Sequence, residues 1–120
     1  FISDAVRLDT GSGTPPRATL ADVADHVEHI RDVAGVGHVG IGSDFDGITD
    51  TPIGLEDVSM FPALLAELSR RGWSENDLAK LAGGNVMRVW HEAETAASQI
   101  QRTRAPSTAT IEELDGRPVS

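Results

Sequence analysis

The sequence predicts an α/β protein whose sheet is not complete within these 120 residues. A short, partly β-branched segment, His38–Gly42, is bounded by glycine and is typical of a buried strand, and helix-like apolar patterns precede and follow it. Only Phe1–Leu8 offers the end of another strand. A lone buried strand leaves backbone groups unpaired, at ~1–3 kcal/mol for each group. We therefore expect the neighbouring strands to come from elsewhere, so that the chain is not a complete domain by itself.

The first helix is expected to begin after Thr19. The Thr19 hydroxyl can accept a hydrogen bond from the amide of Asp22, whose carboxylate can bond back, which is a capping box with Asp in place of the usual Glu. An apolar face follows at helical spacing, formed by Val23, Val27, Ile30 and Ala34. Gly35 is expected to end this helix in a left-handed conformation.

Three further helices follow the strand-like segment, and each has a polar residue at its expected start. The expected N-caps are Ser59, Ser74 and Asn85. The glycines expected to end the first two of these helices are Gly72 and the pair Gly83–Gly84. Trp73 and Trp90 are expected to pack these helices onto the sheet.

The chain is expected to consist of an ordered part, residues 1–102, and a polar tail, residues 103–120, which is rich in Ser, Thr, Pro and charge. Within the ordered part a second interpretation stays open. If His38–Gly42 is a loop, the chain is a small helical bundle, because short apolar runs occur in both strands and loops.

Composition excludes several classes of function. The chain has 10 Lys and Arg against 19 Asp and Glu, a formal net charge of −9, and such a surface repels the phosphates of nucleic acids. It has no cysteine, which excludes disulfides, thiolate zinc sites and a cysteine nucleophile. No apolar run approaches the ~20 residues that span a bilayer. No signal peptide is visible, so a cytoplasmic location is expected.

The residues with the clearest chemical character lie directly after the strand-like segment, in Ser43-Asp44-Phe45-Asp46-Gly47. In α/β proteins ligands bind beyond the carboxyl ends of the strands, where Asp44 is expected. A carboxylate there can take a proton from water and return it to a leaving amine, while Gly42 and Gly47 let the backbone turn. The alternative is ordinary turn chemistry, in which Asp side chains cap backbone amides. A calcium loop is disfavoured because Gly47 comes too early for that motif.

Several stretches of the chain match one family in the same order. They are Ala-Asp-His-Val-Glu-His-Ile (24–30), Val-Ala-Gly (33–35), His-Val-Gly-Ile-Gly-Ser-Asp-Phe-Asp-Gly (38–47), Gly-Leu-Glu-Asp-Val-Ser (54–59), Arg-Gly-Trp (71–73) and Gly-Gly-Asn-Val-Met-Arg-Val (83–89). These stretches closely resemble the C-terminal third of the membrane (renal-type) dipeptidase family of zinc peptidases. The resemblance covers roughly Phe1–Glu92, and several ordered motifs are more specific than any single one.

This resemblance implies a (β/α)8 TIM-type barrel of the amidohydrolase kind, with residues 1–102 as its C-terminal part and His38–Gly42 as its eighth strand. It implies that Asp44 is the acid/base residue when a metal-activated water hydrolyses a dipeptide. The residues expected to shape the loop around it are Gly42, Ser43, Asp46 and Gly47. The family's binuclear zinc site lies on earlier strands and matches no position here, so no metal ligand is expected in this chain.

The same resemblance implies partners: the rest of the barrel upstream of Phe1, a dipeptide substrate and, as a homodimer, a second copy. No nucleic acid and no membrane-spanning segment are expected. The segment alone is expected to be inactive because the zinc ligands lie elsewhere. His26 and His29, three residues apart on one helix, lack a third ligand.

Two other functions stay open. Asp44-Phe45-Asp46-Gly47-Ile48-Thr49 resembles the Asp-x-Asp-Gly-Thr motif of haloacid-dehalogenase-type phosphatases, in which the first Asp is the nucleophile and magnesium neutralises the phosphate. Against this, Gly40, Gly42 and Ser43 interrupt the apolar strand which that family needs. The other alternative is a non-catalytic remnant that completes a barrel.

Overall fold

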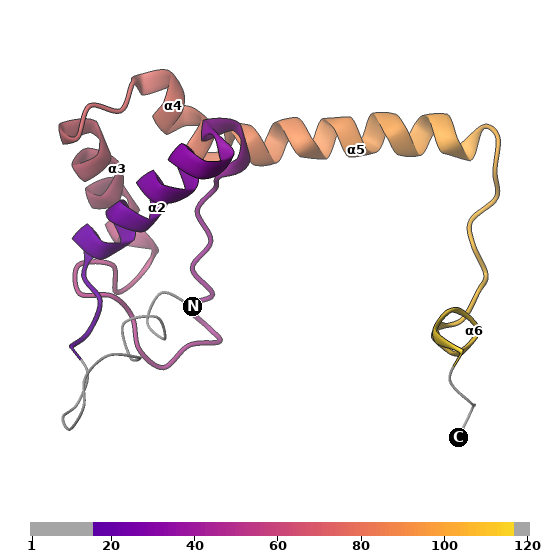
Figure 1. Ribbon diagram of the computed structural model, residues 1–120, viewed down its shortest axis with the longest axis horizontal. Coiled ribbons are helices and arrows are strands. Elements are labelled where there is room, and N and C mark those ends of the chain that lie inside the picture. The colour runs from indigo at the N-terminus through magenta and orange to yellow at the C-terminus, as the bar shows by residue number, and fades with distance from the viewer. Residues whose placement is uncertain (1–15, 117–120) are drawn as a thin grey trace. The chain divides into compact units, whose positions relative to one another are not determined.

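The computed structural model describes residues 16–116, which are mostly helical (Figure 1). In chain order the elements are α2 (Leu20–Ala34), η2 (Val36–His38), η3 (Val58–Met60), α3 (Phe61–Arg70), α4 (Glu75–Ala79), η4 (Lys80–Gly84), α5 (Asn85–Gln101) and α6 (Ile111–Asp115). The turns η2 and η3 are 3₁₀ and η4 is a π turn. The chain divides into two compact units, with the boundary between Met87 and Arg88. The strand end expected in Phe1–Leu8 lies outside the described residues.

The strand expected at His38–Gly42 is not formed among residues 16–116, and this prediction is wrong for the chain by itself. His38 closes the 3₁₀ turn η2, and the backbone becomes extended only at Val39 (φ −122°, ψ 142°). Residues 40–43 then continue without regular structure, with Ile41 packed against the core, and no backbone hydrogen bond within the described part of the chain joins them. A strand needs a neighbour to form a ladder, and the described residues supply none. The sheet of the expected α/β class is therefore absent there as well.

The β-type pairing that the described residues do show is one parallel bridge between Thr19 and Ile53. The Leu20 N–H donates to the Ile53 carbonyl at 2.8 Å, and the Ile53 N–H donates to the Ala18 carbonyl at 2.8 Å. These bonds tie the far end of the loop at residues 43–57 to the start of α2.

Helix α2 begins and ends as its sequence predicts. The Asp22 N–H donates to Thr19 Oγ1 at 3.3 Å, and the Thr19 N–H donates to Asp22 Oδ2 at 2.8 Å, so the capping box is confirmed. The hydrogen bonds from the Thr19 side chain and backbone hold the pKa of Asp22 below its ordinary value. At the other end Gly35 has a positive φ of 88°, and its N–H donates to the Arg31 carbonyl.

The start of α3 differs from its prediction, whereas the start of α4 confirms it. Asp57, not Ser59, supplies the capping carboxylate: its Oδ1 accepts from the Ser59 N–H at 2.8 Å and begins the 3₁₀ turn η3, which runs into α3. Ser59 is therefore not the N-cap of α3. Ser74 is the N-cap of α4, because its Oγ accepts from the Asp77 N–H at 3.1 Å. Gly72 turns the chain between them with a φ of 94°.

Gly83 and Gly84 do not release the chain into a loop. They lie in the π turn η4, which bends at Gly83 (φ 171°, ψ −18°) and continues directly into α5. Asn85 has helical backbone angles and its side chain bonds elsewhere, so the prediction that it is an N-cap is wrong. A Cβ atom at residue 84 would stand 3.1 Å from the Ala79 carbonyl oxygen, so a glycine at this position lets the backbone of the π turn pack closely.

The core of the first unit forms between α2, α3 and the chain that follows them. The fully buried large side chains are Leu64, Leu68 and Leu81. Burying each of them contributes ~2 kcal/mol. Ala24 and Val27 of α2 pack against them, together with Val39, Leu55 and Trp73. The packing role expected for Trp73 is thus found between helices rather than on a sheet.

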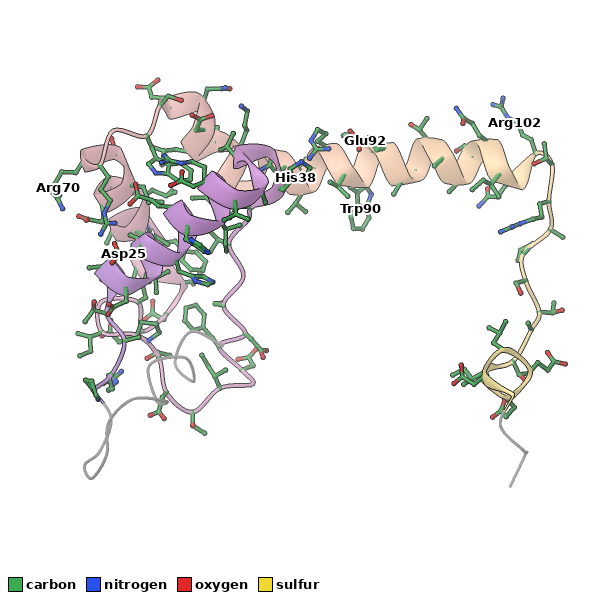
Figure 2. The ribbon with its side chains drawn as sticks, in the orientation of Figure 1. Asp25, His38, Arg70, Trp90, Glu92 and Arg102 are labelled. Atoms are coloured by element: carbon green, nitrogen blue, oxygen red, sulfur yellow. The ribbon has the colours of Figure 1, made fainter. Side chains whose placement is uncertain are left out.

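An ion-pair cluster around Arg71 joins α2 to α3. Its guanidinium donates to Asp25, to Glu28 Oε2 at 2.8 Å and to Glu67 Oε1 at 2.7 Å, and its side chain is only 20% exposed. Figure 2 shows Asp25 on α2, whereas Glu67 belongs to α3. The Trp73 indole N–H also donates to Glu28, at 3.3 Å. These shared carboxylates hold the pKa of Arg71 well above its ordinary range, with Glu67 as the largest cause.

The second unit contains most of α5 and the short helix α6. Trp90 projects from α5 with 62% of its surface exposed (Figure 2), so the packing expected for it is not found in the described part of the chain. Its indole N–H donates to Glu94 at 3.0 Å. Within the expected polar tail, Thr110 and Glu113 form a capping box that starts α6. No helix in residues 16–116 has both the length and the apolar character needed to cross a bilayer.

Replacing Arg71 should destabilise the first unit more than replacing its neighbour Arg70. Arg71→Met leaves the carboxylates of Asp25, Glu28 and Glu67 close together without their shared cation, whereas Arg70 is 73% exposed and pairs with Glu67 alone. Urea unfolding followed by circular dichroism measures both variants. Equal midpoints for Arg71→Met and Arg70→Met would contradict a structural role for the cluster.

The same comparison has a defined pH dependence. Hydrogen bonds from Arg71 and then Arg70 lower the pKa of Glu67 below 4.5 in the folded chain. This stabilisation is present above pH 4.5 and is lost as the pH falls through the lower, folded value. The difference between the unmodified chain and Arg71→Met should therefore shrink on acidification.

Candidate functional site: the Asp44 loop

Residues 39–42, which begin with extended backbone at Val39 and which we call the extended segment, lead into the Asp44 loop. The Asp44 loop, residues 43–47, turns the chain where this segment ends. Asp44 has a φ of +54°, the only positive φ among non-glycine residues of the described chain. Asp tolerates this left-handed conformation better than most side chains do. Its carbonyl accepts a hydrogen bond from the Gly47 N–H at 2.9 Å, which closes a four-residue turn.

The carboxylate of Asp44 lies against the backbone of Gly47. A Cβ atom at position 47 would stand 2.8 Å from both carboxylate oxygens of Asp44, so any larger residue there would force the carboxylate to move. A Cβ atom at Gly42 would meet nothing within 4 Å. The two glycines of the loop therefore differ: Gly47 is required for the position of Asp44, and Gly42 is not required for space.

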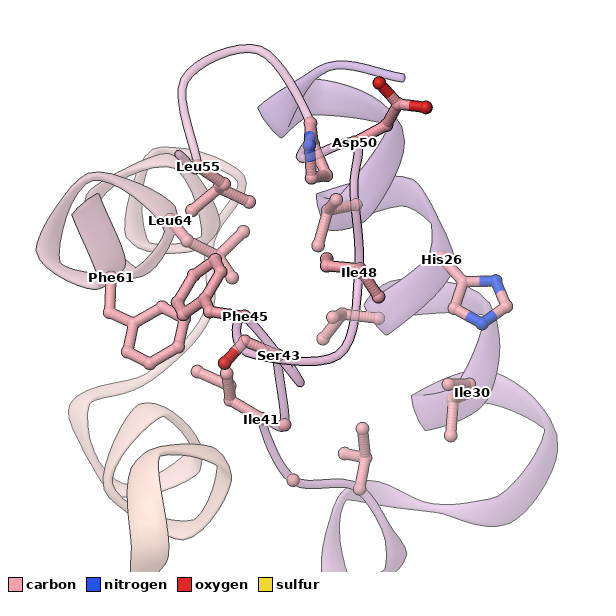
Figure 3. Close-up of a pocket in the computed structure, with 16 residues that line it drawn as sticks. His26, Ile30, Ile41, Ser43, Phe45, Ile48, Asp50, Leu55, Phe61 and Leu64 are labelled. Carbon is pink, nitrogen blue, oxygen red and sulfur yellow. The ribbon is translucent and has the colours of Figure 1, made fainter. Parts of the chain in front are cut away.

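Side chains of the loop alternate between two directions. Ser43 and Phe45 line a pocket, and the Phe45 ring stacks on Phe61 of α3 with centroids 5.9 Å apart and an interplanar angle of 27° (Figure 3). Asp44 and Asp46 are exposed and are not part of the pocket wall. The Phe45 anchor thus holds the loop to the core while the two carboxylates face outward.

The pocket lies among α2, α3 and the loop segments between them, and has a volume of about 290 Å³. Its wall is mostly apolar, with Ile30, Ile41, Ile48, Leu55 and Leu64 among the side chains in Figure 3. Its polar side chains are His26, Ser43 and Asp50. Such a wall suits an apolar group, so the pocket and the outward carboxylates are chemically distinct surfaces.

Asn85 is the functional candidate that sequence reasoning missed. Its side-chain Nδ2 donates to the Val36 carbonyl at 2.7 Å and to the Val39 carbonyl at 2.9 Å. The residue is 7% exposed and is the buried polar residue of the described chain. We call this group of three residues the Asn85 clamp. The signal was the position of the Asn between a Gly-Gly pair and an apolar helix, but a local capping role explains the same pattern.

The resemblance implies that the zinc ligands lie outside this chain. Within residues 16–116 no three His, Cys, Asp or Glu side chains come together as a group that could hold a metal ion. All four histidines lie in this range, and His91 contacts only one carboxylate, that of Glu94 at 3.4 Å. No chemical step is therefore assigned to a metal held by this part of the chain.

The structure brings the predicted loop residues together and leaves their chemistry as a prediction. Asp44 and Gly47 are in contact, Ser43 joins the pocket wall, and Asp46 and Gly42 are exposed. An exposed carboxylate held by its own turn can bond to water or to a substrate amine, and it can exchange a proton with either.

Comparisons with known proteins agree on one family. Residues 1–104 match the family described as membrane dipeptidase (peptidase family M19). Dipeptidase verJ of Clonostachys rogersoniana is 45% identical over 103 residues, which are 86% of this chain and 26% of that protein. Dipeptidase aclJ of Aspergillus oryzae is 50% identical over 86 residues, which are 72% of this chain and 20% of that protein. The chain thus spans about a quarter or less of the length of these curated relatives.

Gly47→Ala should displace the Asp44 carboxylate, whereas Gly42→Ala should leave it in place. The added methyl group at position 47 collides with both carboxylate oxygens, and the one at position 42 enters open space. Because the carboxylate is the end of an exposed side chain, it should rotate away with little loss of stability. Carbon-13 NMR of the Asp44 carboxyl group reports the displacement. An Asp44 resonance that is the same in both variants would disprove the contact.

The chain should bind no stoichiometric zinc by itself. A protein zinc site usually takes three or four ligands, and the described residues bring no such group together. Isothermal titration of the 120-residue chain with zinc measures this directly. A saturable site with one or two equivalents of zinc would contradict the prediction.

Proposed function

The chain belongs to the membrane dipeptidase family, and from that premise we propose that it takes part in the hydrolysis of a dipeptide, with Asp44 as the acid/base residue. The observation that carries this proposal is the position of Asp44. Its carboxylate is exposed, stands directly after the extended segment, and is held by its left-handed turn against Gly47.

In the proposed reaction Asp44 moves one proton. Its carboxylate takes the proton from a water molecule as the water oxygen bonds to the peptide carbonyl carbon. The resulting carboxylic acid then gives the proton to the peptide nitrogen as the C–N bond breaks. The products are two amino acids, and Asp44 returns to its ionised form. When bound by the rest of the enzyme, the family's zinc would supply a water of lowered pKa for this step.

We further propose that the chain completes a (β/α)8 barrel. Three observations support it: residues 40–43 make no backbone hydrogen bond within residues 16–116, Thr19 and Ile53 form a parallel bridge, and the apolar side chains Val89, Trp90 and Ile100 of α5 are exposed. Parallel strands need partners on both edges and helices on both faces. In such a barrel Asp44 would stand at the carboxyl end of a strand, the edge where barrel active sites form.

The proposal assigns other parts of the enzyme to other polypeptide. We propose that the remaining strands and the family's zinc ligands belong to the rest of the barrel. A second copy of the chain, in a homodimer, is a further proposed partner. The matched region 1–104 includes the whole Asp44 loop, so family membership favours a peptidase over the phosphatase interpretation of the same residues.

Asp44→Asn should abolish most activity in an assembled enzyme. We suggest a chimera in which the matched residues of this chain replace the corresponding region of Dipeptidase verJ. Loss of the proton-transfer group should lower kcat ~10²–10⁴-fold. Asp46→Asn is the matched control, because Asp46 is an exposed carboxylate two residues away. Dipeptide hydrolysis followed by amino-acid release measures both.

The outcomes separate the competing functions. An active chimera in which Asp44→Asn and Asp46→Asn behave alike removes Asp44 from the mechanism. A chimera that assembles without any hydrolysis supports a non-catalytic role for the chain. Turnover of a phosphate ester with magnesium, without hydrolysis of dipeptides, would support the phosphatase alternative.

A further inference from the structure

We propose that Asn85 is a positioning residue for Asp44, and this inference rests on the proposed function of Asp44. The Asn85 carboxamide fixes the direction in which residues 40–43 leave the core, and it thereby sets where the Asp44 carboxylate stands. Three features support this role: the two hydrogen bonds of the Asn85 amide, the lack of backbone hydrogen bonds between residues 40–43 and the described chain, and the π turn that places Asn85.

Both donors of the Asn85 amide group are used on one short stretch of chain. One bonds to the Val36 carbonyl in η2, and the other bonds to the Val39 carbonyl, where the backbone becomes extended. Two bonds from one planar group fix an orientation as well as a distance. The side chain of Val39 is buried beside them, so this point of the chain is held by both polar and apolar contacts.

Beyond Val39 the chain has no further backbone anchor until it reaches the Asp44 turn. Residues 40–43 make no hydrogen bond to other backbone groups of the described chain. The next contacts along the chain are the packing of Ile41 against the core, the Gly47–Asp44 bond within the turn and the stack of Phe45 on Phe61. The Asn85 clamp is therefore the last backbone attachment before Asp44 along the chain.

The π turn η4 explains how Asn85 reaches these carbonyls. The Asn85 N–H donates to the Lys80 carbonyl, which draws the start of α5 against η4. The next residue, Val86, would meet a Cβ atom at Gly40 at 3.8 Å, an ordinary contact distance. The start of α5 therefore lies beside the extended segment on both sides of the clamp.

Two substitutions at Asn85 and one control test the proposal. Asn85→Leu keeps a similar volume and removes both donors. Asn85→Asp keeps the shape and, when protonated, recovers one donor. Asn76→Asp is the control, because Asn76 is exposed on α4 and has no contact with the Asp44 loop.

The structural readout uses the 120-residue chain. The carbon-13 resonance of the Asp44 carboxyl group should move in Asn85→Leu and stay unchanged in Asn76→Asp. If both Asn85 variants lose their helical circular dichroism, the unmodified chain decides the matter. The side-chain amide protons of Asn85 should then be protected from solvent exchange while those of Asn76 are not. Unprotected Asn85 protons would overturn the proposal.

The functional readout uses the chimera with Dipeptidase verJ. Misplacing a proton-transfer group by about 1 Å costs on the order of 100-fold in rate, so kcat should fall by about that factor in Asn85→Leu. KM should change little, because Asn85 touches no substrate. Part of the lost kcat should return in Asn85→Asp as the pH falls, since the protonated carboxyl donates to one of the two carbonyls. Asn85→Leu should show no such recovery.

The outcomes distinguish this inference from the function on which it rests. If Asp44→Asn abolishes hydrolysis and both Asn85 variants keep the kcat of Asn76→Asp, the positioning role is wrong and the proposed function stands. If the chimera hydrolyses no dipeptide but the Asp44 resonance moves in Asn85→Leu, the proposed function is wrong. The effect of Asn85 on the position of the Asp44 carboxylate is then still supported. If Asn85→Leu lowers kcat/KM only by raising KM, with kcat unchanged, the positioning role is also wrong.

Discussion

One buried carboxamide connects the C-terminal end of the first unit to its middle. Asn85 bonds to Val36 and Val39, which are 49 and 46 residues earlier in the chain. An intramolecular hydrogen bond contributes ~1 kcal/mol net, but a buried carbonyl left without a partner costs ~1–3 kcal/mol. Loss of the Asn85 amide therefore costs more free energy than the hydrogen bonds themselves contribute, because both carbonyls lose their partner. Because this amide serves both carbonyls, it holds the chain where it turns toward the Asp44 loop.

The sequence correctly predicted those features of the fold that depend on residues close together in the chain, such as helix caps. Thr19 and Asp22 are three residues apart and form their capping box with no help from the rest of the chain. Ser74 caps α4 in the same way. The prediction for Asn85 failed because a capping residue and a long-range donor have the same local sequence, and only the folded chain brings the carbonyls of Val36 and Val39 to it. The strand at 38–42 failed because its ladder requires neighbours that are not among the described residues.

The Asp44 loop shows the same division within the candidate site. The Asp-x-Asp-Gly sequence predicted a turn, and the Gly47–Asp44 hydrogen bond confirms it. Which side chains face inward was not predictable, because it is decided by Phe61, fourteen residues beyond Gly47, on which Phe45 stacks. With Phe45 anchored, the alternation of side chains along the loop leaves Asp44 and Asp46 exposed. The outward direction of the candidate acid is thus a consequence of an apolar contact.

These constraints also explain why residues 40–43 are the natural place for a neighbouring strand. The segment is held at one end by the Asn85 clamp and at the other by the Phe45–Phe61 stack, while residues 40–43 between them form no backbone hydrogen bond to the described part of the chain. Fixed ends lower the entropy that a free segment would lose on pairing. The same two anchors limit how far a neighbouring strand could move Asp44 when it pairs. In the proposed barrel, assembly and the placement of the carboxylate would be separate events, because the turn that holds Asp44 is already complete in this chain.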